Sequence, residues 1–179
     1  VAGSVRNSSR TSASSAAQSV IMIGSPGVSR TSPDYAAIEV MNTILGGSFS
    51  SRLNQNLRET RGYTYGAGSN FSFAPVSGPF MISTDVRTDV TDSSLAVIFR
   101  EIRAIRDVAV TPAELTRARN YLVLGSLEDY ETAGQVAGAI SSGLLFGLPL
   151  STVPAELARI NAVTAADVQR VARLRLDPT

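Results

Sequence analysis

The sequence predicts an α+β fold, a two-layer sandwich in which an antiparallel or mixed sheet packs with helices. Segments patterned as strands occur only in the first half of the chain, at residues 18–24 and 63–86, and residues 92–174 are patterned as helices almost throughout. The order of one strand, two helices, a hairpin and then a run of helices is typical of this class. The 179 residues, 44% of them hydrophobic, suffice for one domain with a sizeable core.

The first strand and the first helix are each bounded by clear signals. Residues 18–24 form a short apolar, β-branched run that ends in the turn sequence 25–27. Residues 32–34, Ser-Pro-Asp, then supply an N-cap, a proline suited to a first helical turn and an acidic residue at the positive end of the helix dipole. A helix is therefore expected from there to Leu45, with the glycines 46–47 ending it.

A second helix is expected over residues 48–61, ended by Gly62. Its apolar residues recur at helical spacing, namely Phe49, Leu53 and Leu57.

A hairpin is expected to follow, with strands at residues 63–74 and 80–86 and a loop between them. Residues 63–74 alternate in character, which predicts that one strand face carries Tyr63, Tyr65, Ala67, Phe71 and Phe73.

The second half is predicted to be helical over residues 92–107, 111–130, 131–146, 151–160 and 164–174. Two of these helices open with capping signatures, and the first carries a continuous apolar stripe. Three strands make a thin sheet for so many helices, so a further strand beyond the end of the chain, or from a partner, is expected.

Two regions are predicted along the chain. Residues 1–17 are rich in Ser, Ala and Arg without periodicity, which predicts a flexible lead-in. Residues 18–179 are expected to form the domain, as a fragment of a longer protein.

The residue types that are missing restrict the chemistry. The sequence contains no His, no Cys and no Lys, so every basic side chain is Arg. Catalysis by Ser-His-Asp, Cys-His or Ser-Lys groups, Schiff-base chemistry and zinc sites with imidazole or thiolate ligands are therefore excluded within this chain. We expect no metal and no cofactor in this chain and no activity from it alone.

The charge pattern disfavours two classes of partner. The net charge is +1 and the basic residues are scattered, so no nucleic-acid or anionic lipid surface is indicated. No apolar run approaches the roughly 20 residues that a membrane-spanning helix requires. We therefore expect neither nucleic acid nor membrane as a partner.

Three polar features allow a ligand site or a plain structural interpretation. Gly46, Gly47 and Ser48 before a helix could bind an anion, but they lack a P-loop lysine, and a turn between helices fits better. Two acidic clusters do not match the spacing of a calcium loop, so solvated surface is the expected role of Glu128, Asp129 and Glu131 and of Asp85, Asp89 and Asp92.

Residues 45–66 carry a resemblance to a known family. They contain Leu-Gly-Gly-Ser-Phe-Ser-Ser-Arg-Leu at 45–53, Leu-Arg-Glu at 57–59, and then Gly62, Tyr63 and Tyr65. This pattern resembles the pitrilysin and mitochondrial processing peptidase family of zinc peptidases, in its C-terminal, non-catalytic domain. The element order over roughly residues 18 to 176 is similar as well.

The resemblance implies a division of labour. In that family a catalytic domain carries His-x-x-Glu-His and zinc, and the degenerate domain closes a clamshell chamber over the peptide. The chain would then be one clamshell half, with a zinc-bearing domain or subunit and a peptide as partners. The family's substrate-contacting arginine and tyrosine match Arg58 and Tyr65, with Tyr63 as the rival, and the loop of Gly46, Gly47 and Ser48 would line the chamber.

A physical argument supports the same two residues, although structural alternatives exist. A guanidinium and a phenol can both donate to the oxygen of a peptide carbonyl under attack, and a tight turn at Gly62 could bring them onto one rim. The alternatives are that strand alternation places Tyr65 in the core beside Phe71 and Phe73, and that Arg58 only pairs with Glu59.

The sequence thus predicts the substrate-binding, non-catalytic half of a zinc peptidase that acts on extended peptides. The alternative is a purely structural, scaffolding subunit with no role in proteolysis, and the presence of Arg58 and Tyr65 favours the first. All-Arg basic usage suggests a bacterial source, and the resemblance to paired bacterial members favours the periplasm or cell envelope over the cytoplasm.

Overall fold

The computed structural model describes residues 17–128, 130–149 and 151–177. Residues 1–16 lie outside them, and so does almost all of the expected lead-in. The elements, in chain order, are β1 (Gln18–Pro26), α1 (Tyr35–Asn42), the π-helical turns η1 (Thr43–Gly47) and η2 (Asn54–Thr60), β2 (Thr64–Phe71), β3 (Pro79–Arg87), the 3₁₀ turn η3 (Thr88–Val90), α2 (Thr91–Asp107), α3 (Pro112–Glu128), α4 (Ala133–Leu145), α5 (Thr152–Ala162) and α6 (Ala165–Arg175).

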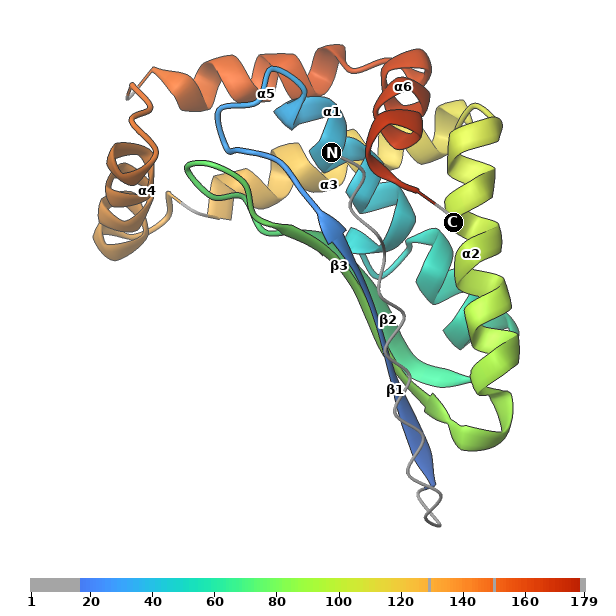
Figure 1. The fold of residues 1–179 in the computed structure, drawn as a ribbon. Helices are drawn as coiled ribbons and strands as arrows, with labels where there is room; N and C mark the ends of the chain where they lie inside the picture. The colour runs from blue at the N-terminus through green and yellow to red at the C-terminus, as the bar shows by residue number, and fades with distance from the viewer. Residues whose placement is uncertain (1–16, 129, 150, 178–179) are drawn as a thin grey trace.

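The strands form one antiparallel sheet in the order β1-β3-β2, so the hairpin strand β3 lies in the middle. The inner face of the sheet is buried against the helices through residues such as Ile21, Ile82 and Val86. The helices cover this face only, and the opposite face of the sheet remains open (Figure 1). The α+β class, the two layers and the antiparallel pairing are therefore confirmed.

Helix α1 occupies the centre of the core, where Ile38, Val40 and Met41 are fully buried. Helix α6 packs against α1 and α2, and α5 packs against α1 and α3. Two ion pairs reinforce this packing across long stretches of sequence. Arg30 pairs with Glu156 of α5 at 2.6 Å, and Asp34 pairs with Arg170 of α6 at 2.7 Å.

Helix α4 stands apart from this core. It has no buried residue, and it exposes Ile140, Leu144 and Leu145. Figure 1 shows that α3 runs past the upper end of the sheet and that α4 hangs from it on the open side. None of the helices in the described residues is both long and apolar enough to cross a membrane.

Most predicted elements match the structure to within a few residues, but the second helix differs. Residues 48–51 form a turn, and the helix begins only at Arg52 and continues as the wider η2. Phe49 therefore does not share the buried face of Leu53 and Leu57, and its side chain is 64% exposed.

Candidate functional site

A surface recess at the start of β2 brings together the three residues expected to contact substrate. Its lining comprises Gln18, Arg58, Glu59, Gly62, Tyr63, Thr64, Tyr65, Asp85 and Arg87. The recess forms because the chain turns sharply between η2 and β2. Gly62 adopts the left-handed backbone conformation, with φ of 61°, which a residue with a side chain rarely takes. Its amide donates to the carbonyl of Arg58 at 2.9 Å, so helix end and strand start share one rim.

Tyr65 does not lie in the core, contrary to what strict alternation along the strand suggests. Its side chain is 91% exposed, whereas Phe71 on the same strand is 4% exposed. The cause is a bulge in β2: Thr64 pairs with Val86 and Ala67 with Thr84, so Tyr65 and Gly66 together oppose a single residue of β3. The additional residue reverses the facing of the strand before Ala67 and turns Tyr65 outward.

Two threonines hold the bulge in place. The hydroxyl of Thr64 accepts a hydrogen bond from the amide of Gly66 at 3.0 Å. The hydroxyl of Thr84 lies 2.9 Å from the carbonyl oxygen of Gly66 and 3.0 Å from the hydroxyl of Thr64. Because Thr84 is buried, its two contacts are partly shielded from water, and all three bonds restrain the backbone that carries Tyr65.

Asn54 connects the bulge to the loop that precedes η2. Its side-chain carbonyl accepts from the amide of Ala67 at 3.1 Å, and its amide group donates to the carbonyl of Ser48 at 3.2 Å. The residue is only 9% exposed. Asn54 is not recognisable as a site residue from the sequence, because an asparagine within a helical segment gives no sign of a partner on a distant strand.

Arg58 is held by weak contacts that leave its guanidinium accessible. The guanidinium carbon lies 4.4 Å from the ring centre of Phe49, a cation–π contact, and Nε lies 3.6 Å from Glu59. The expected pairing with Glu59 is thus present, but both side chains are more than one third exposed, and such pairs contribute only about 0–1 kcal/mol. The exposed Phe49 positions Arg58 more than it contributes to the core.

Tyr63 differs from Tyr65 in its surroundings. Its side chain is half-buried and packs against the core cluster, although it also lines the recess. Arg87, at the opposite side, is engaged with Asp89 at 3.1 Å, and the hydrogen bond from Arg87 lowers the pKa of the Asp89 carboxyl. The recess therefore offers the Tyr65 phenol and the Arg58 guanidinium as accessible hydrogen-bond donors, beside the exposed Gln18 and Arg87.

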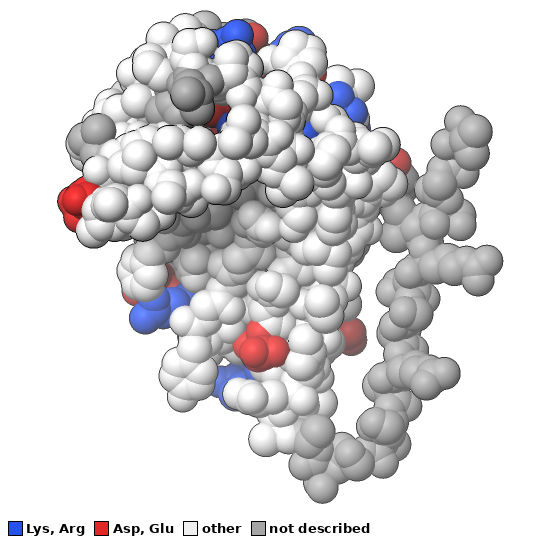
Figure 2. All heavy atoms as spheres, turned by 90° about the vertical axis from the view of Figure 1, so that its left-hand side faces the viewer, with Lys and Arg blue, Asp and Glu red and all other residues white. Residues whose placement is uncertain are grey.

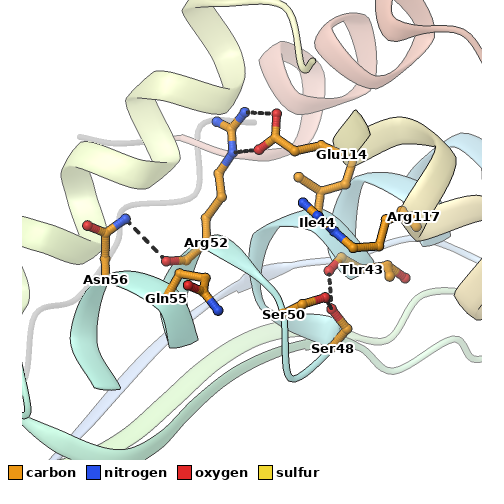
Figure 3. Close-up of a pocket in the computed structure, with 10 residues that line it drawn as sticks. Thr43, Ile44, Ser48, Ser50, Arg52, Gln55, Asn56, Glu114 and Arg117 are labelled. Atoms are coloured by element: carbon orange, nitrogen blue, oxygen red, sulfur yellow. Dashed lines mark hydrogen bonds and ion pairs between the residues drawn. The ribbon is translucent and has the colours of Figure 1, made fainter. Parts of the chain in front are cut away.

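The loop of Gly46, Gly47 and Ser48 lies apart from this recess. Gly46 packs against β2 so closely that an added Cβ would lie 2.5 Å from the backbone nitrogen of Ser69. Ser48 lines a different, smaller pocket between the loop before η2 and helix α3 (Figure 3). The structure thus brings Arg58, Tyr63 and Tyr65 together in the recess. The glycine loop lies outside the recess and is connected to the bulge through Asn54.

The pocket of Figure 3 is organised by an ion pair. Nε and a terminal nitrogen of Arg52 donate to the two carboxylate oxygens of Glu114 at 2.7 and 3.1 Å. Burial alone would raise the pKa of Glu114, but the hydrogen bonds from Arg52 and Thr111 outweigh it and lower that pKa to about 2. Glu114 also accepts from the amide and the hydroxyl of Thr111 at the start of α3. The ion pair therefore joins the start of α3 to the helical turn that precedes η2.

The described residues contain no group of three or more acidic side chains that could share a metal ion. Asp89 forms an ion pair with Arg87, and Asp129 lies outside the described residues. Because the chain also has no His and no Cys, its residues do not suit zinc.

Comparison with known proteins gives one family. The model of the peptidase M16 inactive domain matches residues 6–122. An uncharacterised zinc protease of Streptomyces coelicolor is 34% identical over 157 residues, which cover 87% of this chain and 34% of that protein. A non-peptidase homolog of Helicobacter pylori is 25% identical over 154 residues, which cover 84% of this chain and 35% of that protein.

The fold is similar to solved structures as well. The crystal structure of a peptidase M16 inactive domain from Pseudomonas fluorescens superposes with a TM-score of 0.84 at 29% identity, covering 91% of this chain and 39% of that chain. The chain spans about a third of the length of the curated relatives that it matches.

Proposed function

Since the chain belongs to the peptidase M16 family and corresponds to its inactive domain, we propose that it binds extended peptides for a zinc-bearing partner domain or subunit. In this proposal the chain forms one half of a closed chamber. The partner supplies the zinc, and Arg58 and Tyr65 hold the peptide at the site of cleavage. The observation that carries the proposal is the outward turn of Tyr65 into the recess shared with Arg58.

The cost of that outward turn supports a functional role. A tyrosine that is 91% exposed gains little from burial, and the bulge that exposes it requires a dedicated network of Thr64, Thr84 and Asn54. Bulges are frequent beside active sites, where they redirect a side chain. A merely structural tyrosine would need no such arrangement.

The chemistry of the two donors fits a reacting peptide bond. When the carbonyl of a peptide is attacked, negative charge develops on its oxygen, and fixed hydrogen-bond donors stabilise that charge most strongly where water is excluded. The Tyr65 hydroxyl and the Arg58 guanidinium can both donate. In the isolated chain the recess is open, so a partner domain over it is needed to exclude water.

The test combines the chain with the zinc-bearing domain or subunit that accompanies it and measures cleavage of a peptide. We expect Tyr65→Phe and Arg58→Ala each to lower kcat by about 10²–10³, the effect of losing one donor to a developing oxyanion. The matched control is Tyr121→Phe, since Tyr121 lies on α3, is 55% exposed and lies outside the recess. Wild-type turnover by both recess variants, or cleavage by the chain alone, would contradict the proposal.

A structural subunit without a part in proteolysis is the second candidate. The name of the Helicobacter pylori relative, a non-peptidase homolog, favours it. The same experiment separates the two candidates. A structural subunit would support its partner equally well with Phe at position 65 and Ala at position 58.

A further inference from the structure

The open face of the sheet continues from the recess and is uncharged over most of its area. The strand register arranges its outward side chains in rows across the sheet. The row at the recess pairs Val20 with Asp85 beside the bulge. The next row joins Met22, Ser83 and Gly68, and the third joins Gly24, Met81 and Asn70. Charge is therefore confined to the recess end of this face.

Apolar side chains of this face are exposed to solvent, both beside Asp85 and in the uncharged rows. Val20 is 69% exposed and Met22 is 66% exposed on β1. The sulfur of Met81 lies over Gly24, where an added Cβ would be 2.7 Å from it. Two of the three methionines of the chain thus lie on neighbouring strands of this one face. Methionine is flexible and polarisable, so it adapts to apolar side chains of different shapes.

The surroundings of this face suit a narrow ligand. Figure 2 looks toward the open side and shows a hollow beneath the overhanging helices, with its charged side chains mainly toward the lower end. An extended peptide advances about 3.4 Å per residue and points alternate side chains the same way, so every second residue would meet the next row of the sheet. A charged side chain buried on such a surface without a partner carries a large desolvation cost.

We propose that the open sheet face is a subsite for apolar side chains of an extended peptide, formed by Val20, Met22 and Met81. The substrates would then be peptides with uncharged, apolar residues two and four positions away from the residue held at Tyr65. This inference rests on the proposed function, because the peptide must lie along the face that leads from the recess.

The test uses the complete peptidase and a peptide series with Leu, Glu or Arg at each position on both sides of the cleaved bond. We expect kcat/KM for Leu to exceed that for Glu by about tenfold or more at the position that faces Met22, the range typical of apolar pockets. Met22→Glu should abolish this preference and favour Arg at that position. Met22→Arg should favour Glu there. Val108→Glu, at an exposed residue after α2, is the matched control.

The opposite shifts with the two charged variants distinguish peptide binding from a structural effect. A loss that is equal for every peptide in both variants would show that Met22 contacts the partner domain, and unchanged selectivity would show that the peptide lies elsewhere. Either outcome overturns the inference. The proposed function fails separately, because it predicts that Tyr65→Phe lowers kcat for all peptides, whatever their selectivity.

Discussion

At the scale of single residues, the direction of Tyr65 depends on side chains that never reach a substrate. Asn54 is the clearest case, since its buried side chain serves the bulge and the glycine loop at once. We expect Asn54→Ala to lower the free energy of unfolding by about 1–3 kcal/mol, because the amide of Ala67 would remain buried without an acceptor. Chemical denaturation measures this difference.

Asn70→Ala provides the matched control for that substitution. Asn70 lies on the same strand but is exposed, and it donates only to the hydroxyl of Ser72 at 3.1 Å. Its replacement should change the free energy of unfolding by about 0.5 kcal/mol or less. Equal stabilities for the two variants would show that Asn54 does not support the bulge.

Glu39 on α1 makes stability depend on pH. Burial raises the pKa of its carboxyl to about 7, partly offset by the nearby charge of Arg30. Between the ordinary pKa of 4.5 and about 7, the folded chain therefore binds this proton more tightly than the unfolded chain, and the contribution to stability is lost as the pH rises through that window. We expect Glu39→Gln to remove this loss, so that the variant exceeds the wild type in unfolding midpoint at pH 8 and not at pH 4.5. Parallel pH profiles of the unfolding midpoint for the wild type and the variant would contradict this expectation.

The recess residues could be predicted from the sequence only in part. The pattern at 57–65 identifies Arg58 and Tyr65, and the glycine at position 62 indicates the turn between them. The facing of Tyr65 could not be predicted, because a bulge arises from hydrogen bonds between strands and leaves no mark on the alternation of a single strand. The roles of Asn54 and Thr84 depend on partners that only folding brings near.

At the scale of elements, the local signals were sufficient for nearly all boundaries. Capping boxes begin α3, α4 and α6, and glycines with positive φ follow η2 and α4. By contrast, α1 begins at Tyr35 without the expected cap from Ser32, and Gly46 and Gly47 continue the first helix as part of η1. The predicted start of the second helix was wrong. The spacing of Phe49, Leu53 and Leu57 suits a helix, but residues 48–51 form a turn that accepts hydrogen bonds from the side-chain amide of Asn54. Hydrogen bonds from the Asn54 side chain within this segment thus compete with the helical pattern.

Two capping boxes with the same chemistry are expected to differ in their energetic effect. Thr164 caps α6, and Thr132 caps α4, each through a reciprocal hydrogen bond with the third residue of its helix. We expect Thr164→Ala to lower the free energy of unfolding by about 1 kcal/mol, since α6 is anchored in the core by Val168 and Val171. Thr132→Ala should change it much less, because α4 buries nothing. Denaturation of both variants measures this, and equal losses would contradict the difference.

At the scale of the whole molecule, the sheet has one face covered by helices and one face open, and the proposed peptide binding uses the open face. The covered face holds the core, and the open face leads from the recess toward the overhanging α4 (Figure 1). The number of strands and the layer order followed from the sequence.

The packing of α6 against α1 and α2 also governs how the chain can be made. The core residues of α1 meet those of α6 across more than a hundred residues of intervening sequence, and Asp34 meets Arg170. During synthesis, the apolar side of α1 therefore emerges from the ribosome long before α6 exists to shield it. Ile38 and Met41 therefore lack their α6 neighbours in the nascent chain until residues 165–175 have been synthesised, which favours aggregation during that interval.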